Sequence, residues 1–419
     1  MAGDQDGVVD GRGGSSDASG GEPAPRPAVA VSIRSQKLVG SVQPRSNFGG
    51  EVAVSGDTIA VASSPSRVIE LFQRTPSGWV SAAAVETPNV GNCGTDALAL
   101  DGDLAAVGAH SASTPGWVHV LRRTAGTWAI EARIDDPSAD AQAEFGSAVA
   151  ISGDTIVVGA RRNHDGSPGS VHVFVKRASG WQLQATLTSW DAESDGKTLG
   201  DDQFGLGVAI AGDTLAVARP WSERKGAIVY LRDSDGVWRR ELAFPPDDAP
   251  LDQPIALALS ADRLLMGDNG HRRAHLYLRN GVGTWSSEEW FTAQPDYNLG
   301  YSVALGDNLA VVGTLAEAGR EAYGNAYAFV RNNGGGPSLS TCCQTTVRQP
   351  RGLGRRSRPR ARRSWSARPG RPNWATKSGP PTSSSSTSLP RFRDLCHRSK
   401  APSSRAATPG LPLVLGRHG

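Results

Sequence analysis

The stretch FGSAVAISGDTIVVGA (residues 145–160) decides the fold, because versions of it recur along the chain. Six copies align on an acidic residue in a short turn, at Asp57, Asp103, Asp154, Asp213, Asp262 and Asp307. Their mean spacing is about 50 residues, which suits a four-stranded propeller blade better than a helical repeat. The repeat therefore indicates an array of like structural units.

Each copy has the pattern of four strands. In the third copy, residues 148–152 and 155–160 are short apolar runs, and the Gly-Asp pair between them suits a type II′ hairpin turn. Residues 171–176 are mixed, and residues 181–187 alternate between apolar and polar, as a strand with one wet face does. We predict an all-β fold: a β-propeller of four-stranded antiparallel blades with six visible repeats, closed as six or seven blades, with disordered ends.

A tryptophan recurs at the start of the fourth strand, at Trp79, Trp128, Trp181, Trp238 and Trp285. It could serve as an aromatic platform for sugars, or it could pack between blades. Packing explains the series better, because a packing residue is needed in every blade and a catalytic or binding residue is needed once. We therefore expect the repeated residues to be structural.

These residues resemble the FG-GAP repeat family, the bacterial relatives of the integrin α-subunit propeller. The resemblance rests on the Phe-Gly opening, the GDTIVVGA hairpin and the later Gly-Trp, and it covers roughly residues 35–333. It implies a propeller that serves in adhesion, in ligand binding or as an accessory domain of an enzyme. Calcium-binding versions carry an Asp-x-Asp-x-Asp-Gly loop in the first hairpin. Here that hairpin closes with Gly-Asp alone, which is too short to surround the ion, so no calcium positions carry over.

Composition divides the chain into three parts. Residues 1–31 are a Gly/Ser/Asp/Pro spacer expected to be disordered, residues 32–335 are the propeller, and residues 336–419 are a basic low-complexity tail, also expected to be disordered. Of the 44 basic and 41 acidic residues, 17 basic and one acidic lie in 341–419, which leaves the rest with 27 basic and 40 acidic. An acidic body thus carries a strongly basic end.

The tail has two readings. It is either a basic arm for nucleic acid or an acidic surface, or the product of a frameshift, because pattern and charge change in the middle of the sixth repeat. The frameshift is the favoured reading. The sixth repeat lacks a recognisable fourth strand. Residues 36–42 have the sequence pattern of a fourth strand, but the patterns of the first three strands do not precede them. They could complete the sixth blade and close the ring; a lost seventh blade is the alternative.

Candidate ligand motifs are weak. The loop Asp191-Ala-Glu-Ser-Asp-Gly196 with Asp202 has calcium-loop spacing but no flanking helices, and Gly196-Lys197-Thr198 lacks the first glycine of a phosphate loop. His119 and His172 share one place in the repeat and are expected to be sheet residues; the other copies have Ile69, Val229, Leu276 and Tyr327 there. Cys93 reads as a buried small apolar residue, and Cys342, Cys343 and Cys396 lie in the tail, so no disulfide framework is implied.

We assign no catalytic, cofactor-binding or metal residues and no cofactor. The sequence predicts a non-catalytic interaction module, a monomer that binds a protein or glycan, with no membrane span and with nucleic acid only through the tail. By resemblance it belongs outside the cell or in the envelope, although no signal peptide is visible. The alternatives are a hydrolase or lyase with carboxylates at the mouth of the channel, and a damaged gene product without a function of its own.

Overall fold

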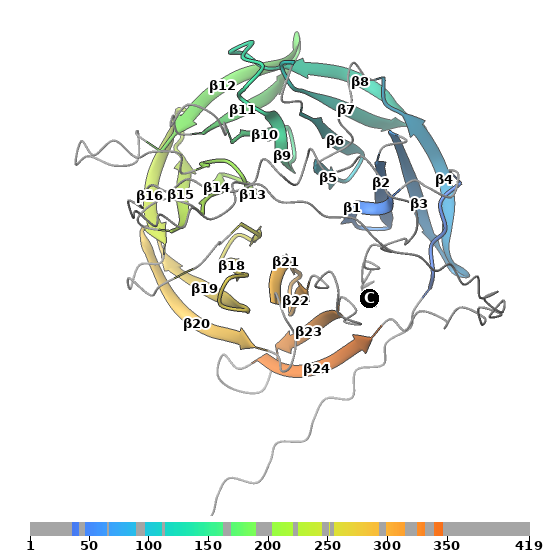
Figure 1. Cartoon of the computed structure of the whole chain (residues 1–419). Coiled ribbons are helices and arrows are strands. Elements are labelled where there is room, and N and C mark those ends of the chain that lie inside the picture. The colour runs from blue at the N-terminus through green and yellow to red at the C-terminus, as the bar shows by residue number, and fades with distance from the viewer. Residues whose placement is uncertain are drawn as a thin grey trace, which may run out of the picture.

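The structure is a computed structural model, and it describes residues 36–41, 47–64, 67–88, 97–110, 114–161, 169–189, 203–220, 225–244, 251, 255–292, 299–314, 325–331 and 339–346. These residues contain no helix, and hence none long and apolar enough to cross a membrane. They form six antiparallel sheets of four strands each, arranged as a ring (Figure 1). The prediction of an all-β propeller is confirmed, and the number of blades is six.

The strands follow the repeat in order. Blade 1 holds β1 (Asn47–Ser55), β2 (Thr58–Ser64), β3 (Val68–Thr75) and β4 (Gly78–Glu86); blade 2 holds β5 (Ala97–Asp101), β6 (Leu104–Ala109), β7 (Trp117–Thr124) and β8 (Thr127–Asp135); blade 3 holds β9 (Phe145–Ser152), β10 (Thr155–Ala160), β11 (Ser170–Arg177) and β12 (Gly180–Thr188). Blade 4 holds β13 (Val208–Ala211), β14 (Thr214–Arg219), β15 (Gly226–Arg232) and β16 (Trp238–Phe244); blade 5 holds β17 (Leu257–Leu259), β18 (Arg263–Asp268), β19 (Arg273–Gly281) and β20 (Thr284–Thr292); blade 6 holds β21 (Leu299–Leu305), β22 (Leu309–Thr314), β23 (Asn325–Arg331) and β24 (Leu339–Thr346).

The first strand of each blade lies nearest the axis and the fourth lies at the rim (Figure 1). The hydrophobic core is divided among the interfaces between neighbouring blades. At the interface of blades 3 and 4, for example, Val157 and Val173 of one blade pack against Leu215 and Ile228 of the next. Similar clusters join blades 1 and 2, 2 and 3, 4 and 5, and 5 and 6. This is why the two middle strands of each blade are apolar on both faces.

The two ends of the propeller differ. Strands one and two, and strands three and four, are joined by short turns at one end, which we call the tight-turn face; Gly153, at the first turn of blade 3, has the positive φ of 54° that a type II′ turn needs at its first position. The other end, the long-loop face, carries the connections from strand two to strand three and from each blade to the next. Topology thus sends most of the longer and variable segments to one face.

The sixth blade corrects an expectation. Strand β24, Leu339–Thr346, pairs with β23 from Arg331 to Asn325, so the fourth strand comes from the segment 336–419 for which disorder is expected. Residues 36–42 do not provide that strand. The physical reason is that β23 offers one open edge, and β24 follows β23 closely along the chain. The tail beyond residue 346 and the spacer 1–31 lie outside the described residues.

Residues 36–41 lie instead on blade 1. The Gln36 side chain accepts a hydrogen bond from the Trp79 backbone N–H and donates one to its carbonyl, each at 2.7 Å. Leu38 packs on the cluster of Ile59, Val61 and Phe72, and the Ser41 N–H donates to both oxygens of the Glu70 carboxylate. The segment covers the face of blade 1 that would otherwise meet a preceding blade.

Candidate functional site

In blades 2 to 5, a basic residue at the end of the third strand joins the blade to the one before it. In blade 4, Arg232 forms an ion pair with Asp213 of its own first turn at 2.6 Å and donates to the Thr155 hydroxyl of blade 3 at 3.1 Å. Its guanidinium also lies 5.1 Å from the Trp238 ring, in cation–π geometry. Related contacts recur at Arg74, Arg123, Lys176 and Arg279. Asp57, Asp103 and Asp213 therefore each hold the basic residue of their own blade, and in blades 2 and 4 that residue also reaches the blade before it.

Four of the five repeated tryptophans pack between blades, as predicted, and Trp79 of blade 1 packs in a cluster with Leu38 instead. Trp238 is 7% exposed, belongs to the core shared by blades 3 and 4, and donates from Nε1 to Gln184 at 3.0 Å. Trp128 packs on blade 1 in the same way, and Trp285 packs on blade 4. With their faces covered by neighbouring blades, these rings are not available as sugar platforms.

The glycines of the FG and GA elements are also structural. A Cβ on Gly159, near the end of β10, would stand far inside van der Waals contact of the Gly205 carbonyl in the next blade. Gly108 meets Gly146, and Gly267 meets Gly300, in the same arrangement. The two glycines therefore let the opening of one blade lie directly on the second strand of the blade before it.

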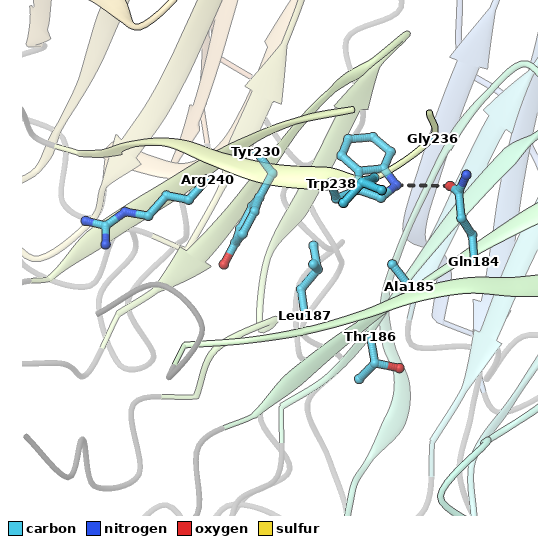
Figure 2. Close-up of a pocket in the computed structure, with 9 residues that line it drawn as sticks. Gln184, Ala185, Thr186, Leu187, Tyr230, Gly236, Trp238 and Arg240 are labelled. Carbon is cyan, nitrogen blue, oxygen red and sulfur yellow. Dashed lines mark hydrogen bonds between the residues drawn. The ribbon is translucent and has the colours of Figure 1, made fainter. Parts of the chain in front are cut away.

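A groove of about 390 Å³ runs along the rim between blades 3 and 4 (Figure 2). Gln184 to Leu187 of β12 form one wall, and Tyr230, Trp238 and Arg240 line the other. The Gln184–Trp238 hydrogen bond crosses it, as Figure 2 shows. Because the Gln184–Trp238 hydrogen bond spans the groove and joins the two blades, we interpret the groove as part of the interface between them.

The histidines predicted to be sheet residues are confirmed as such. His172 is 4% exposed, and its ring nitrogens lie 3.1 Å from the hydroxyls of Ser170 and Thr186. His119 is 5% exposed, and its Nε2 accepts a hydrogen bond from Trp117 Nε1 at 3.0 Å. Burial lowers the pKa of both imidazoles, because the charged form loses its hydration.

The repeat register needs one correction. The third-strand partner of the fourth residue after each turn Asp is Glu70, His119, His172, Ile228, His275 and Ala328 in blades 1 to 6. The sequence placed Ile69, Val229, Leu276 and Tyr327 there, each one residue away. Cross-strand pairing sets the register, and the variable loops before the third strand conceal it in the sequence.

Other sequence candidates are not brought into one site. The calcium-like loop 191–202, the Gly196–Thr198 motif and Cys93 lie outside the described residues, as does Cys396. Within the described ranges, no three His, Cys, Asp or Glu side chains gather as a metal site requires. In the innermost strands that the structure describes, the only carboxylates are Glu51 in β1 and Asp101 in β5, and Asp101 accepts a hydrogen bond from the Gly153 N–H of blade 3.

Charged residues that occur once gather at the long-loop face of blades 3, 4 and 5. Glu144 pairs with Arg161 across the opening of blade 3, and Arg219, at the end of β14, is 1% exposed. Asp268 ends β18 and is fully buried. Blade 3 has Ala160 at the place of Arg219 and Asp268, so these charges depart from the repeat. A buried charge is costly unless it is paired, and a single occurrence is what a functional residue would show.

The group in blade 5 has two basic side chains hydrogen-bonded to one buried carboxylate. Asp268 accepts hydrogen bonds from Arg273 Nε at 2.8 Å and from His271 Nδ1 at 3.0 Å. The sequence analysis missed this group, although two signals were present: the repeat's Gly-Ala becomes Gly267-Asp268, and the basic run His271-Arg272-Arg273 follows within five residues. Both signals can be recognised only when the fifth repeat is compared with the other copies.

Comparisons with known proteins agree with the repeat. Residues 128–174, from the fourth strand of blade 2 to the third strand of blade 3, match the FG-GAP repeat. The resemblance to that family is thereby confirmed. No curated protein matches the sequence.

Several solved structures are similar at low identity. A protein from Lactobacillus plantarum has 13% identity and a TM-score of 0.47, covering 69% of this chain and 82% of that one. A protein of unknown function from Desulfotomaculum acetoxidans has 12% identity and a TM-score of 0.47, covering 72% and 90%. A candidate 6-phosphogluconolactonase from Bacteroides uniformis has 12% identity and a TM-score of 0.49, covering 68% and 80%.

Proposed function

We propose that this FG-GAP-repeat propeller is a non-catalytic interaction module that binds a protein or glycan through its long-loop face, at the cell surface or in the envelope. One observation carries the proposal. The repeated Trp, Gly and basic residues of the inner blades are engaged in joining blades, whereas charges that depart from the repeat lie at the long-loop face of blades 3 to 5.

The difference between the short turns of one face and the longer connections of the other supports a binding role. Short hairpin turns at the tight-turn face leave little room for variation, and binding residues in general concentrate on loops held by a rigid scaffold. The long-loop face carries the longer connections, and the blades that hold them pack on one another from blade 1 to blade 6. The location outside the cell rests on the FG-GAP resemblance alone.

A binding screen with matched variants tests the proposal. The full chain is screened by surface plasmon resonance against a glycan panel and against purified envelope proteins. His271→Ala and Tyr301→Ser alter the long-loop face, and Val282→Ser alters a turn of the tight-turn face where the side chain is 81% exposed. We expect a ligand whose binding falls with the first two variants and is unchanged by the third.

Two outcomes would contradict this function. Binding that is lost only with Val282→Ser would place the site on the other face. Turnover of a glycoside, ester or polysaccharide by the full chain would favour the hydrolase or lyase, in which case the search for acid and base groups moves to the long loops.

A further inference from the structure

The connection between β18 and β19 presents a fixed cationic group on an acidic body. Asp268 is buried, and it holds His271 and Arg273 in place through the two hydrogen bonds described above. The His271 side chain is 42% exposed, and Arg272 beside it is exposed with a positive φ of 58°. One internal carboxylate thus binds two basic side chains, His271 and Arg273, and the exposed Arg272 lies between these two in the sequence.

Trp290 restrains the Arg273 side chain of this group. Its ring centroid lies 3.8 Å from the Arg273 guanidinium carbon and 3.6 Å from the His275 ring centroid. His275 is also 3.9 Å from the Tyr277 ring and accepts or donates a 2.7 Å hydrogen bond with the Ser287 hydroxyl. The Arg273 side chain is therefore held from two sides, by a carboxylate and by an indole, and loses little further freedom when it binds a ligand.

An exposed aromatic residue follows the glycine whose backbone lies against this cationic group. Gly300, at the opening of blade 6, fits so closely that a Cβ there would stand 2.9 Å from the Asp268 backbone nitrogen and would overlap the Arg273 carbonyl. The next residue, Tyr301, is 52% exposed. Among the described residues it is the one aromatic side chain with more than half of its surface exposed, so its place beside the basic loop matters.

We propose that His271, Arg272, Arg273 and Tyr301 form a binding site for a carboxylate-bearing sugar, such as a uronic acid unit of an acidic polysaccharide. The cationic donors take the carboxylate in charge-assisted hydrogen bonds, and the Tyr301 ring packs on the apolar face of the sugar. This inference rests on the proposed function and names the ligand class for the same face.

Acidic peptide is the competing ligand class, and two observations favour the sugar. The group is compact and rigid, which suits one anionic unit, whereas an acidic segment is better recognised by a long cationic track. The exposed ring adds an apolar contact that a glutamate or aspartate side chain would not fill.

Calorimetry on the full chain tests the site. The probes are an oligosaccharide of glucuronic acid, its neutral glucose counterpart, and poly-glutamate. We expect binding of the first and none of the second. His271→Ala, Arg272→Ala and Tyr301→Ser should each weaken binding by about tenfold, which is the usual effect of one charge-assisted contact. Arg239→Ala, on the outer strand β16 with a side chain 70% exposed, removes the same charge elsewhere and should leave binding unchanged.

The possible failures are distinguishable. Equal binding of the neutral sugar, preference for poly-glutamate, loss of binding with Arg239→Ala, or no binding by the folded chain would overturn this site. If another ligand is then found that depends on His271 or Tyr301, the proposed function stands without it. Cleavage of the acidic oligosaccharide, seen as release of an unsaturated sugar by ultraviolet absorbance, would support the site and overturn the non-catalytic role.

Discussion

The interface between blades 3 and 4 and the face of blade 1 that begins the ring solve the same packing problem in different ways. In the first, a single strand, β12, pairs with β11 and also packs on blade 4. At the start of the ring the two tasks are separated. Strand β24 pairs with β23 of blade 6, and residues 36–41 pack on blade 1.

The repeat explains this difference. Gln184 meets the Trp238 indole in blade 4, and Gln36 meets the Trp79 backbone in blade 1, so both blades receive an amide at the same corner. In blade 3 that amide belongs to the fourth strand of a sheet, whereas Gln36 belongs to a described segment that is part of none of the six sheets. A fourth-strand surface is therefore a requirement of each following blade, and any segment with suitable side chains can meet it.

The largest effect is expected from removing β24. A chain that ends at residue 335 leaves the edge of β23 open, and it should melt at a clearly lower temperature than the full chain. A chain that ends at residue 347 keeps β24 and should melt as the full chain does. The measurement is circular dichroism against temperature. Equal melting of the chain that ends at residue 335 would mean that β24 adds no stability, and would favour the expectation that residues 336–419 are disordered.

The fold could be predicted from the sequence because the residues that determine it recur in most of the six repeats. Period, strand pattern, Gly-Asp turns and tryptophan packing all followed from features present in most copies. It failed at two kinds of place. Strand β24 has none of the repeat's residues, so only the open edge of β23 marks it. The Asp268–His271–Arg273 group occurs once, and its members are linked by contacts that no spacing rule predicts.

The next effect concerns the two corner tryptophans. Trp238→Ala should destabilise the protein by about 3–5 kcal/mol, because it opens a cavity in a closed interface. Trp79 is only half-buried under residues 36–41, so Trp79→Ala should cost clearly less. Urea unfolding of both variants measures the difference. Equal losses would mean that residues 36–41 cover blade 1 as firmly as a complete blade does.

Close approach of the blades gives a smaller effect. Gly159→Ala forces a Cβ against the Gly205 carbonyl, and overpacking of this kind costs about 1–3 kcal/mol. Gly281→Ala is the matched control, since its Cβ would meet nothing within 4 Å and its φ is not positive. That control should change stability by less than about 0.5 kcal/mol. A similar loss in both variants would show that glycine entropy, and not the contact between blades, governs the site.

The buried histidines should make the stability of the protein depend on pH. Ile228, which holds the same place in blade 4, has no group that titrates. Burial lowers the pKa of His172, so the folded protein keeps a neutral ring while the unfolded chain takes up a proton near its ordinary pKa of about 6.5. Below that pH the unfolded state binds more protons, and stability should fall by at most about 1.4 kcal/mol per pH unit for this group. His172→Ile should flatten the curve. An unchanged slope between pH 6.5 and 5 would assign the loss to other groups, His119 among them.

The smallest effect concerns a hydrogen bond between the first turns of neighbouring blades, which we call the latch; it is present at three interfaces and is lost between blades 4 and 5. The Ser152 hydroxyl accepts a hydrogen bond from the Gly212 N–H of the next blade at 2.9 Å, and Ser55 and Asp101 do the same for Gly102 and Gly153. Blade 4 has Ala211 at that place and so cannot make the contact with blade 5. Ser152→Ala should therefore cost about 0.5–1.5 kcal/mol, the net value of one such bond. Ser77→Ala, in an exposed turn, is the control for loss of a hydroxyl. If urea unfolding shows no difference between the two variants, the latch is dispensable, and the interface of blades 4 and 5 has lost nothing by its absence.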